Sequence, residues 1–203
     1  MQMKTSFSVV LLAGGKSRRM GKDKRFLRWT SSIQGRPQTL LQHVIARASE
    51  LTDDIIVVTN DSLDVAPARP VTDIHPDSGT LGGIYSGLMS ICNNLAFVAA
   101  ADMPFIDTHL VKTLMERVGE ADAVVPVIDD RPEPLHAVYR KTCAASMHAR
   151  ITSNQLKIAP VFNALKTEWV SEVELRKIEP ALRSFRNLNT PLDYRQALAD
   201  STG

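Results

Sequence analysis

Apolar residues along the chain are gathered in short runs that alternate with longer amphipathic stretches. Four runs are nearly continuous and rich in β-branched or small apolar side chains, at residues 7–12, 54–59, 95–101 and 123–128. Such runs are typical of buried strands in a parallel sheet. The stretches between them place apolar residues with a helical period. The pattern predicts a Rossmann-like, doubly wound α/β fold, with a mostly parallel sheet and helices on both faces.

Two stretches show the helical period with particular clarity. The first has its apolar face on Leu40, Leu41, Val44, Ile45 and Leu51. The second has its apolar face on Leu110, Val111, Leu114, Met115 and Val118. Asp107 is placed to cap the second helix, and Pro191 to begin a last one. The polar run 129–134 predicts a loop, which leads into a strand at 135–140 on an irregular edge of the sheet.

Size and charge favour one soluble domain. The chain has 203 residues, of which 44% are hydrophobic, enough for one ordinary core, so we expect a single domain over residues 1–203. The net charge of +2 is spread along the chain and gives no reason to expect binding to nucleic acid or to an anionic membrane. One basic cluster stands out, at residues 16–25.

The ends and the cysteines indicate a cytoplasmic protein. The first residues lack the apolar run of a secretory signal, and no segment is apolar enough over the length needed to cross a bilayer. Cys92 and Cys143 are far apart and form no Cys-x-x-Cys unit, which argues against a cysteine zinc site. We expect both to be packed thiols.

A glycine-bearing turn rich in cations follows the first predicted strand, at residues 12–24. Glycines allow backbone N–H groups to approach phosphate oxygens, and the Lys and Arg side chains supply balancing charge. The turn is no Walker A loop, because Asp23 stands where Ser or Thr is required, and it is no G-x-G-x-x-G motif. A glycine pair alone would favour an ordinary turn, but the density of cations favours a triphosphate site.

The turn resembles the Leu-Ala-Gly-Gly, Arg-Met-Gly and Lys pattern of molybdenum cofactor guanylyltransferases, a branch of the nucleotidyltransferase superfamily. The resemblance implies that the backbone of the turn lines the nucleotide, that Lys24 reaches the phosphates, and that Arg19 is a second phosphate partner. The nucleotide-binding residues that it implies in this turn are Leu12, Ala13, Gly14, Gly15 and Lys24. It assigns the nucleotide to a half at about residues 1–105 and the pterin substrate to a half at about 106–203.

Asp102 follows the strand predicted at 95–101, at the carboxyl end where open α/β sheets bind ligands. One or two carboxylates suffice for Mg²⁺, which takes its other ligands from water and phosphates. Taken alone, Asp102 could equally cap the next helix. The segment 101–105 resembles the family's Cys-Asp-Met-Pro-Phe metal-binding segment, with Ala101 in place of the cysteine, and implies that Asp102 binds Mg²⁺ and acts in catalysis with Lys24 and Arg19.

A second glycine-rich segment runs from Asp73 to residue 84 and resembles the family's Asp, Gly-Pro-Leu-Ala-Gly-Ile motif. Thr80 and Gly82 replace the proline and the alanine. The resemblance implies that Asp73, Gly79 and Leu81 help to hold the base and ribose. Asn60 matches in order the family's asparagine near the nucleotide, and it could equally be a turn former.

The segment 187–193 resembles the family's Asn-x-Asn-Thr-Pro-x-Asp motif on the molybdopterin side, which implies roles for Asn187 and Asn189. A plain helix start explains Pro191 without a ligand. The strand at 134–140 resembles the family's Pro-Leu and Tyr-Arg strand near the second substrate, which implies a contact from Tyr139. His136 lies among apolar residues and the histidines show no metal-ligand spacing, so we assign no catalytic histidine.

The resemblance implies transfer of GMP from GTP to the terminal phosphate of molybdopterin, with Mg²⁺ and release of pyrophosphate. The rivals are a sibling that uses CTP on molybdopterin or attaches nucleotides to sugar phosphates or other phosphates, and an inactive GTP-binding regulatory module. Base choice depends on a few hydrogen bonds, and the sequence leaves it open. The family analogy also implies contact with other molybdenum cofactor synthesis or insertion proteins.

Overall fold

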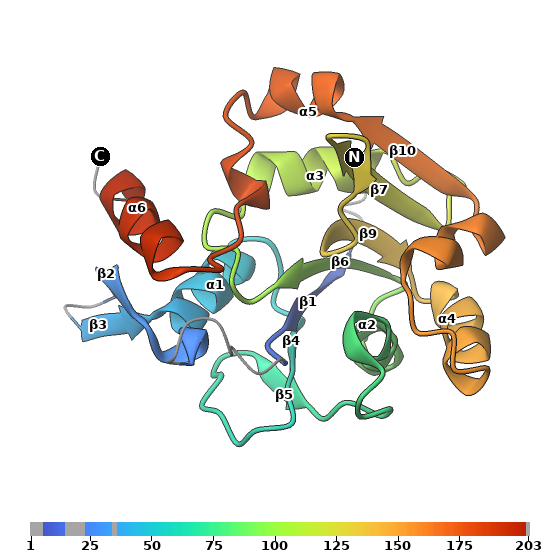
Figure 1. Ribbon diagram of the computed structural model, residues 1–203, viewed down its shortest axis with the longest axis horizontal. Helices are drawn as coiled ribbons and strands as arrows, with labels where there is room; N and C mark the ends of the chain where they lie inside the picture. The colour runs from blue at the N-terminus through green and yellow to red at the C-terminus, as the bar shows by residue number, and fades with distance from the viewer. Residues whose placement is uncertain (1–5, 15–22, 34–35, 202–203) are drawn as a thin grey trace.

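The computed structural model describes residues 6–14, 23–33 and 36–201. Its centre is an eight-stranded sheet (Figure 1). Across the sheet the strands are β10 (Thr167–Ser171), β7 (Ala123–Ile128), β9 (His136–Arg140), β6 (Leu95–Ala100), β1 (Ser8–Leu12), β4 (Ile55–Val58) and β5 (Arg69–Val71). The short strand β8 (Arg131–Pro132) pairs with β7, and β2 (Arg28–Ile33) and β3 (Arg36–Thr39) form a separate hairpin.

Among the described residues, four of the seven strand pairs of the large sheet are parallel, so the predicted parallel character is confirmed for only part of a mixed sheet. β1 pairs in parallel with β4 and β6, β4 with β5, and β10 with β7. The continuous apolar runs account for this arrangement, because the residues of β4 and β6 are buried throughout. The four strands predicted from those runs are therefore confirmed, to within a residue or two at their ends.

The strand predicted at 135–140 exists, but the expectation that it lies at an edge is wrong. β9 lies inside the sheet, antiparallel to both β6 and β7. The hairpin through β8 turns the chain back at the carboxyl end of β7, and β9 then fills the gap between two strands that run the same way. The sheet is therefore mixed at this point, although the part made of β6, β1, β4 and β5 is parallel.

Helices cover both faces of the sheet (Figure 1). One face packs against α1 (Leu40–Ser49), α3 (Thr108–Glu116), α5 (Glu172–Ile178) and α6 (Pro191–Ser201). The other packs against α2 (Gly79–Ser90) and α4 (Cys143–Thr152), together with the 3-10 helix η2 (Ala159–Ala164). Two further 3-10 helices are η1 (Lys24–Phe26) and η3 (Arg183–Phe185). The doubly wound arrangement is confirmed.

The predicted helix signals are largely confirmed. Thr39 forms a capping box with Gln42 at the start of α1, and Asp107 accepts hydrogen bonds from the first amides of α3. Pro191 is the first residue of α6. The predicted apolar faces of α1 and α3 are buried, except that Leu51 lies beyond α1 and is only partly buried.

Two glycines let α2 lie unusually close to β1. A Cβ atom at Gly87 would stand 2.3 Å from Cγ1 of Val10, and one at Gly83 would stand 3.2 Å from Cδ1 of Leu12. At Gly82 a Cβ atom would stand 2.7 Å from that of Ser78. These glycines therefore allow close packing of the helix against the protein itself.

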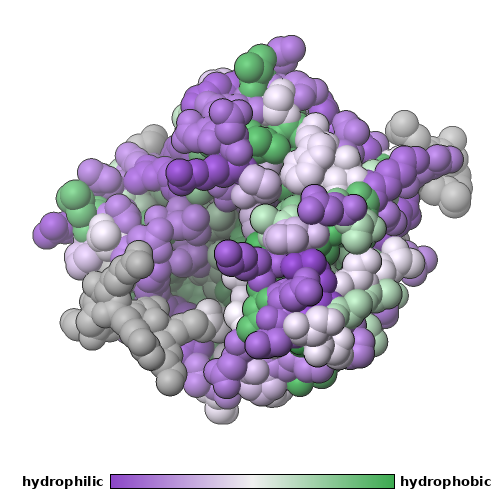
Figure 2. All heavy atoms as spheres, turned by 45° about the vertical axis from the view of Figure 1, so that its right-hand side comes forward, coloured by the Kyte–Doolittle hydropathy of each residue, from purple (hydrophilic) through white to green (hydrophobic). Residues whose placement is uncertain are grey.

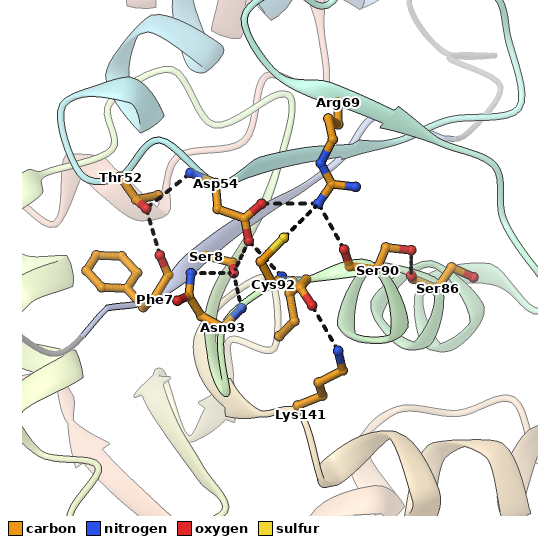
Figure 3. Close-up of polar contacts among 11 residues, drawn as sticks. Phe7, Ser8, Thr52, Asp54, Arg69, Ser86, Ser90, Cys92, Asn93 and Lys141 are labelled. Carbon is orange, nitrogen blue, oxygen red and sulfur yellow. Dashed lines mark hydrogen bonds and ion pairs between the residues drawn. The ribbon is translucent and has the colours of Figure 1, made fainter.

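A polar cluster ties together the amino ends of β1, β4 and β6 (Figure 3). Asp54 Oδ2 accepts hydrogen bonds from Ser8 Oγ at 2.5 Å and from the Cys92 amide at 2.9 Å, and Arg69 Nη2 lies 3.1 Å from Asp54 Oδ1. Burial alone would raise the pKa of Asp54, but these hydrogen bonds outweigh it and lower the pKa. Lys141 joins the cluster by donating to the Ile91 carbonyl at 2.8 Å.

The surface is mainly hydrophilic on the face shown in Figure 2, where hydrophobic side chains form small, separate groups. Among the residues that the structure describes, no helix is both long and apolar enough to span a bilayer. Both cysteines are free thiols. Cys143 is buried as expected, which raises its pKa to about 12, whereas Cys92 is exposed, so the expectation of a packed thiol is wrong there.

Candidate active site

The carboxyl ends of β1, β4 and β6 meet at one edge of the sheet. Leu12 is opposite Val58 of β4 and Ala100 of β6. Beyond the strands, Ala13 N donates to Val58 O and Ala101 N donates to Leu12 O, each at 3.0 Å. The turns after these strands therefore lie side by side, at the edge where open α/β sheets bind ligands.

Lys24, Asp102 and Asn189 come together at this edge from three distant parts of the chain. Lys24 Nζ lies 3.0 Å from Asp102 Oδ2 and 3.2 Å from Asn189 Oδ1. The Lys24 side chain is 13% exposed and that of Asp102 is 25% exposed, so water screens their attraction only in part. The sequence assigned these residues to phosphate, metal and pterin respectively, and the structure places them in one cluster.

The carboxyl-terminal segment is fixed to the turn that carries Asp102. Leu188 N donates to the backbone oxygen of Asp102 at 3.1 Å, and Leu188 is fully buried. Asp193 Oδ2 then accepts from the amides of Asn189 and Thr190, at 2.9 and 2.7 Å. The Asn189 amide holds the pKa of Asp193 below its usual value. This turn presents Asn189 to Lys24 at the start of α6.

Helix α1 holds the other side of the Asp102 turn. His43 Nε2 lies 3.0 Å from the carbonyl oxygen of Pro104, and Arg47 donates to the carbonyl oxygen of Ile106 at 3.0 and 3.3 Å. The His43 ring stacks on Trp29 with centroids 4.9 Å apart. Burial lowers the pKa of His43, so the ring stays neutral near pH 7 with Nε2 as the donor to the carbonyl.

Asn60 and Asp73 form a second cluster. Asn60 Oδ1 accepts from the Asp73 amide at 3.0 Å, which joins the turn after β4 to the turn after β5. Asp73 Oδ1 accepts from Ser86 Oγ at 2.8 Å and from the His75 amide at 3.1 Å. Both predicted residues therefore shape the turn before α2, and no hydrogen bond joins them to Lys24, Asp102 or Asn189 within the described residues.

The remaining nucleotide-side predictions fall in different environments. Ala13 is buried and Gly14 is exposed, with no packing neighbour within 4 Å of a Cβ built there. Gly79 begins α2 at a φ of +60°, which favours glycine, whereas the Leu81 side chain is fully buried in the core. Any contact from Leu81 to a nucleotide would therefore come from its backbone. Gly15 and Arg19 lie outside the described residues.

The other two residues predicted for the pterin side lie in different environments. Asn187 is exposed, two residues before Asn189. Tyr139 is fully buried, and its hydroxyl donates to the Pro134 carbonyl at 2.9 Å. It stands opposite Ala96, near the amino end of β6 and far along the strand from Asp102. The predicted contact of Tyr139 with the second substrate is therefore wrong in this structure, where Tyr139 is a core residue.

His136 is a packed core residue, as expected. It is fully buried, its ring lies 4.5 Å from that of Phe185 and 4.8 Å from that of Phe97, and neither ring nitrogen has a hydrogen-bond partner among the described residues. Burial lowers its pKa to about 3, with a small opposing effect from Asp107. The ring is therefore neutral, and nothing places it against Asp102.

The cluster suits a cation held by few protein ligands. In the part of the chain that the structure describes, no group of three or more His, Cys, Asp or Glu side chains could hold a metal. Asp102 offers one carboxylate, of which Oδ2 contacts Lys24. A single carboxylate beside a basic side chain fits Mg²⁺, which keeps several waters and shares phosphate oxygens of a nucleotide, better than it fits Zn²⁺.

Three residues at this edge had no assignment from the sequence. His43 and Arg47, one helical turn apart, act on backbone carbonyls, which leave no signature in side-chain type. Arg25 was visible only as the end of the basic cluster, yet its guanidinium contacts both sides of the turn after β1. The i, i+4 spacing of His43 and Arg47 was the one available signal.

Solved structures with the same arrangement define the class of fold. The crystal structure of 2-C-methyl-D-erythritol 4-phosphate cytidylyltransferase from Thermus thermophilus superposes with a TM-score of 0.65 and covers 97% of this chain and 98% of its own. At 17% identity the likeness concerns the fold alone. The fold is that of nucleotidyltransferases of the nucleotide-diphospho-sugar transferase type.

Within that class the family is clear, because the MobA-like NTP transferase domain matches residues 9–167. The chain belongs to this family. It is 34% identical over 193 residues to the molybdenum cofactor guanylyltransferase of Desulfosudis oleivorans, covering 94% of this chain and 93% of the relative. The crystal structure of molybdopterin-guanine dinucleotide biosynthesis protein A from Archaeoglobus fulgidus has 27% identity and a TM-score of 0.81, covering 96% and 98%.

Proposed function

We propose that the protein is a molybdenum cofactor guanylyltransferase, which transfers GMP from GTP to the terminal phosphate of molybdopterin and releases pyrophosphate. The observation that carries this proposal is the contact of Lys24 with both Asp102 and Asn189. It joins the predicted phosphate and metal residues to the predicted pterin side. The names of the full-length relatives support the choice of substrates.

In the proposed reaction an oxygen of the acceptor phosphate forms a bond to the α-phosphorus of GTP. The bond from that phosphorus to the α,β-bridging oxygen breaks, and the electron pair leaves with pyrophosphate. A phosphate monoester is largely ionised near neutral pH, so no general base is needed. The work of the chain is alignment and charge neutralisation, for which Lys24 is placed at the carboxyl edge of the sheet.

Asp102 is the proposed Mg²⁺ ligand. When bound, the ion would neutralise charge on the phosphates and align the leaving pyrophosphate. The brace from His43 and Arg47 and the bond from Leu188 hold the turn of Asp102 from two sides. A carboxylate fixed in this way needs little reorganisation on binding the cation, which favours catalysis.

The turn after β1 and the turn before α2 are the proposed GTP site. Its residues are Leu12, Ala13, Gly14, Gly15, Asn60, Asp73, Gly79 and Leu81, with Arg19 and Lys24 on the phosphates. Asn189 and Asn187 are proposed for the molybdopterin side. We further propose a cytoplasmic location and docking to other molybdenum cofactor synthesis or insertion proteins.

Calorimetric titration with GTP, CTP, ATP and UTP, each with Mg²⁺ and again with EDTA, tests the base and the metal. Binding of GTP alone, strengthened by Mg²⁺, is the expected result. A preference for CTP would move the protein to the cytidylyl siblings. A pyrophosphate-release assay with molybdopterin then separates an enzyme from an inactive GTP-binding module, which would bind GTP and release nothing.

The variant Asp102→Asn tests the metal ligand in the same assay. We expect pyrophosphate release to fall by about 100-fold or more, because the charge that fixes the cation is removed. Asp53→Asn is the matched control, since Asp53 is exposed at the opposite edge of the sheet. Equal metal-dependent rates for Asp102→Asn and the unaltered chain would refute the assignment.

A further inference from the structure

Arg25 follows Lys24 directly, and oxygen atoms surround its guanidinium group. Nε lies 2.9 and 3.0 Å from the two carboxylate oxygens of Asp23, and Nη2 lies 2.5 Å from Oδ2 of the same residue. This is the planar, forked pairing that arginine makes and lysine cannot. Asp23 in turn caps η1, the 3-10 turn that carries Lys24, by accepting from the Arg25 amide.

The remaining terminal nitrogen of Arg25 reaches across to two strands. Nη1 donates to the Ala13 carbonyl at 3.0 Å, just beyond β1, and to Thr59 Oγ1 at 3.4 Å, just beyond β4. It also lies 2.5 Å from Asp61 Oδ2. One side chain thus holds Ala13 and Asp23, which stand on either side of residues 14–22, and ties both to the end of β4.

The charges around Arg25 are unbalanced without it. Asp23 and Asp61 bring two negative charges to an edge proposed to bind a triphosphate, and Arg25 is the cation paired with both. Its side chain is 15% exposed, so the pairs are only partly screened. The hydrogen bond with Asp23 raises the pKa of Arg25 and, reciprocally, lowers that of Asp23. The group therefore stays charged throughout the neutral range.

We propose that Arg25 is a positioning residue of the nucleotide site: by fastening Ala13 to Asp23, it fixes the turn from which Lys24 reaches Asp102. The inference rests on the proposed function for its effect on GTP, but its effect on Lys24 is independent of any ligand. Loss of the guanidinium would release Ala13 and Asp23 from this shared contact, and fixing these two residues again would oppose GTP binding.

The test compares Arg25→Met and Arg25→Lys with Arg69→Met. Arg69 is a matched control, because it is also paired with an aspartate but belongs to the cluster at the amino ends of the strands (Figure 3). The first readout is the rate at which acetic anhydride labels Lys24, followed by peptide mass spectrometry. The second is the dissociation constant for GTP with Mg²⁺, together with KM and kcat for pyrophosphate release.

In Arg25→Met we expect Lys24 to be labelled several-fold faster and the GTP dissociation constant and KM to rise about tenfold, with a smaller change in kcat. Arg25→Lys should lie between, because it restores the charge without the fork. Arg69→Met should lower the melting temperature and leave both readouts unchanged. If Arg25→Met does not fold, Arg25→Lys against Arg69→Met makes the same comparison.

Labelling of Lys24 at the unaltered rate in a folded Arg25 variant would overturn the positioning role, and so would an unchanged GTP affinity in a chain that binds GTP normally. Failure of the proposed function is seen separately, as absence of GTP binding by the unaltered chain. Faster labelling of Lys24 in that case would still support the role of Arg25 in placing the lysine.

Discussion

The ammonium group of Lys24 lies 3.0 Å from the carboxylate of Asp102, although 78 residues separate the two along the chain. Because we propose that they act on one phosphate group and its cation, we expect their contributions to be non-additive. Lys24→Met should reduce kcat/KM by about 100-fold, and adding it to Asp102→Asn should cost much less than the product of the two single losses.

A double-mutant cycle in the pyrophosphate-release assay measures this coupling. Lys112→Met, on the exposed surface of α3, is the control for loss of a lysine and should keep the unaltered rate. Strictly multiplicative losses would mean that Lys24 and Asp102 act on separate steps, against the single cluster described above.

The contacts of His43 and Arg47 in α1 with the turn of Asp102 predict an effect of α1 on catalysis. His43→Phe keeps an aromatic ring to stack on Trp29 but removes the donor to the Pro104 carbonyl. A hydrogen bond of this kind contributes about 1 kcal/mol, so kcat should fall roughly five- to tenfold if it orients the Asp102 turn. The KM for GTP should change little.

Steady-state kinetics over a range of Mg²⁺ concentrations gives the check, since a displaced Asp102 turn should also raise the Mg²⁺ requirement. If the His43→Phe variant keeps the kcat and the Mg²⁺ dependence of the unaltered chain, His43 only fills space beside Trp29.

Close packing of α2 on β1 predicts a large effect of one methyl group. Gly87→Ala places a Cβ atom 2.3 Å from Cγ1 of Val10. The backbone of α2 or of β1 must move to relieve this clash. We expect a loss of about 1–3 kcal/mol in the free energy of unfolding, the usual range for overpacking. Urea denaturation measures it.

Val10→Ala removes the atom that the new methyl group would meet. In the double variant the destabilisation should therefore be smaller than the sum of the two single effects. Additive losses would mean that helix propensity or some other contact, and not the clash with Val10, determines the need for glycine at position 87.

His136 predicts how stability depends on pH. Its folded-state pKa of about 3 lies below the ordinary value of 6.5, so the unfolded chain binds the proton more readily. The stabilisation from this residue is complete above pH 6.5 and is lost as the pH falls towards 3. Between pH 6.5 and 5 the loss should be about 2 kcal/mol.

Urea denaturation of the unaltered chain and of His136→Leu at pH 7 and pH 5 isolates this residue. The variant should be at least as stable at pH 7, because it replaces an imidazole whose nitrogens are buried without hydrogen bonds in the described structure, and its stability should fall less at pH 5. An equal fall in both chains would assign the acid sensitivity to other groups.

The sequence predicted the parallel part of the sheet well, because β1, β4 and β6 are buried on both faces and read as continuous apolar runs. The sequence did not predict the position of β9 within the sheet, because the hydrophobic period and the composition identify a strand but not its neighbours. Only the pairing of β9 with β6 and β7, which depends on the return through β8, decides that place. Tyr139 was assigned from its resemblance to a family strand, and that resemblance does not reveal that the side chain is fully buried.

The site was predictable where side chains carry the chemistry. Lys24, Asp102 and Asn189 were named from motifs, and they meet in the structure. Arg25 and His43 were not, because they act on the carbonyls of Ala13 and Pro104 or on carboxylates nearby in space. Any residue has a carbonyl group, so such partners cannot be read from residue types.

The bond from the Leu188 amide to the Asp102 carbonyl has a consequence for the order of events during synthesis. The ribosome delivers Lys24 and Asp102 well before Asn189. A nascent chain can therefore pair β1, β4 and β6 while the third member of the cluster is still missing. The cluster of Lys24, Asp102 and Asn189 can thus be completed only after Asn189 has left the exit tunnel.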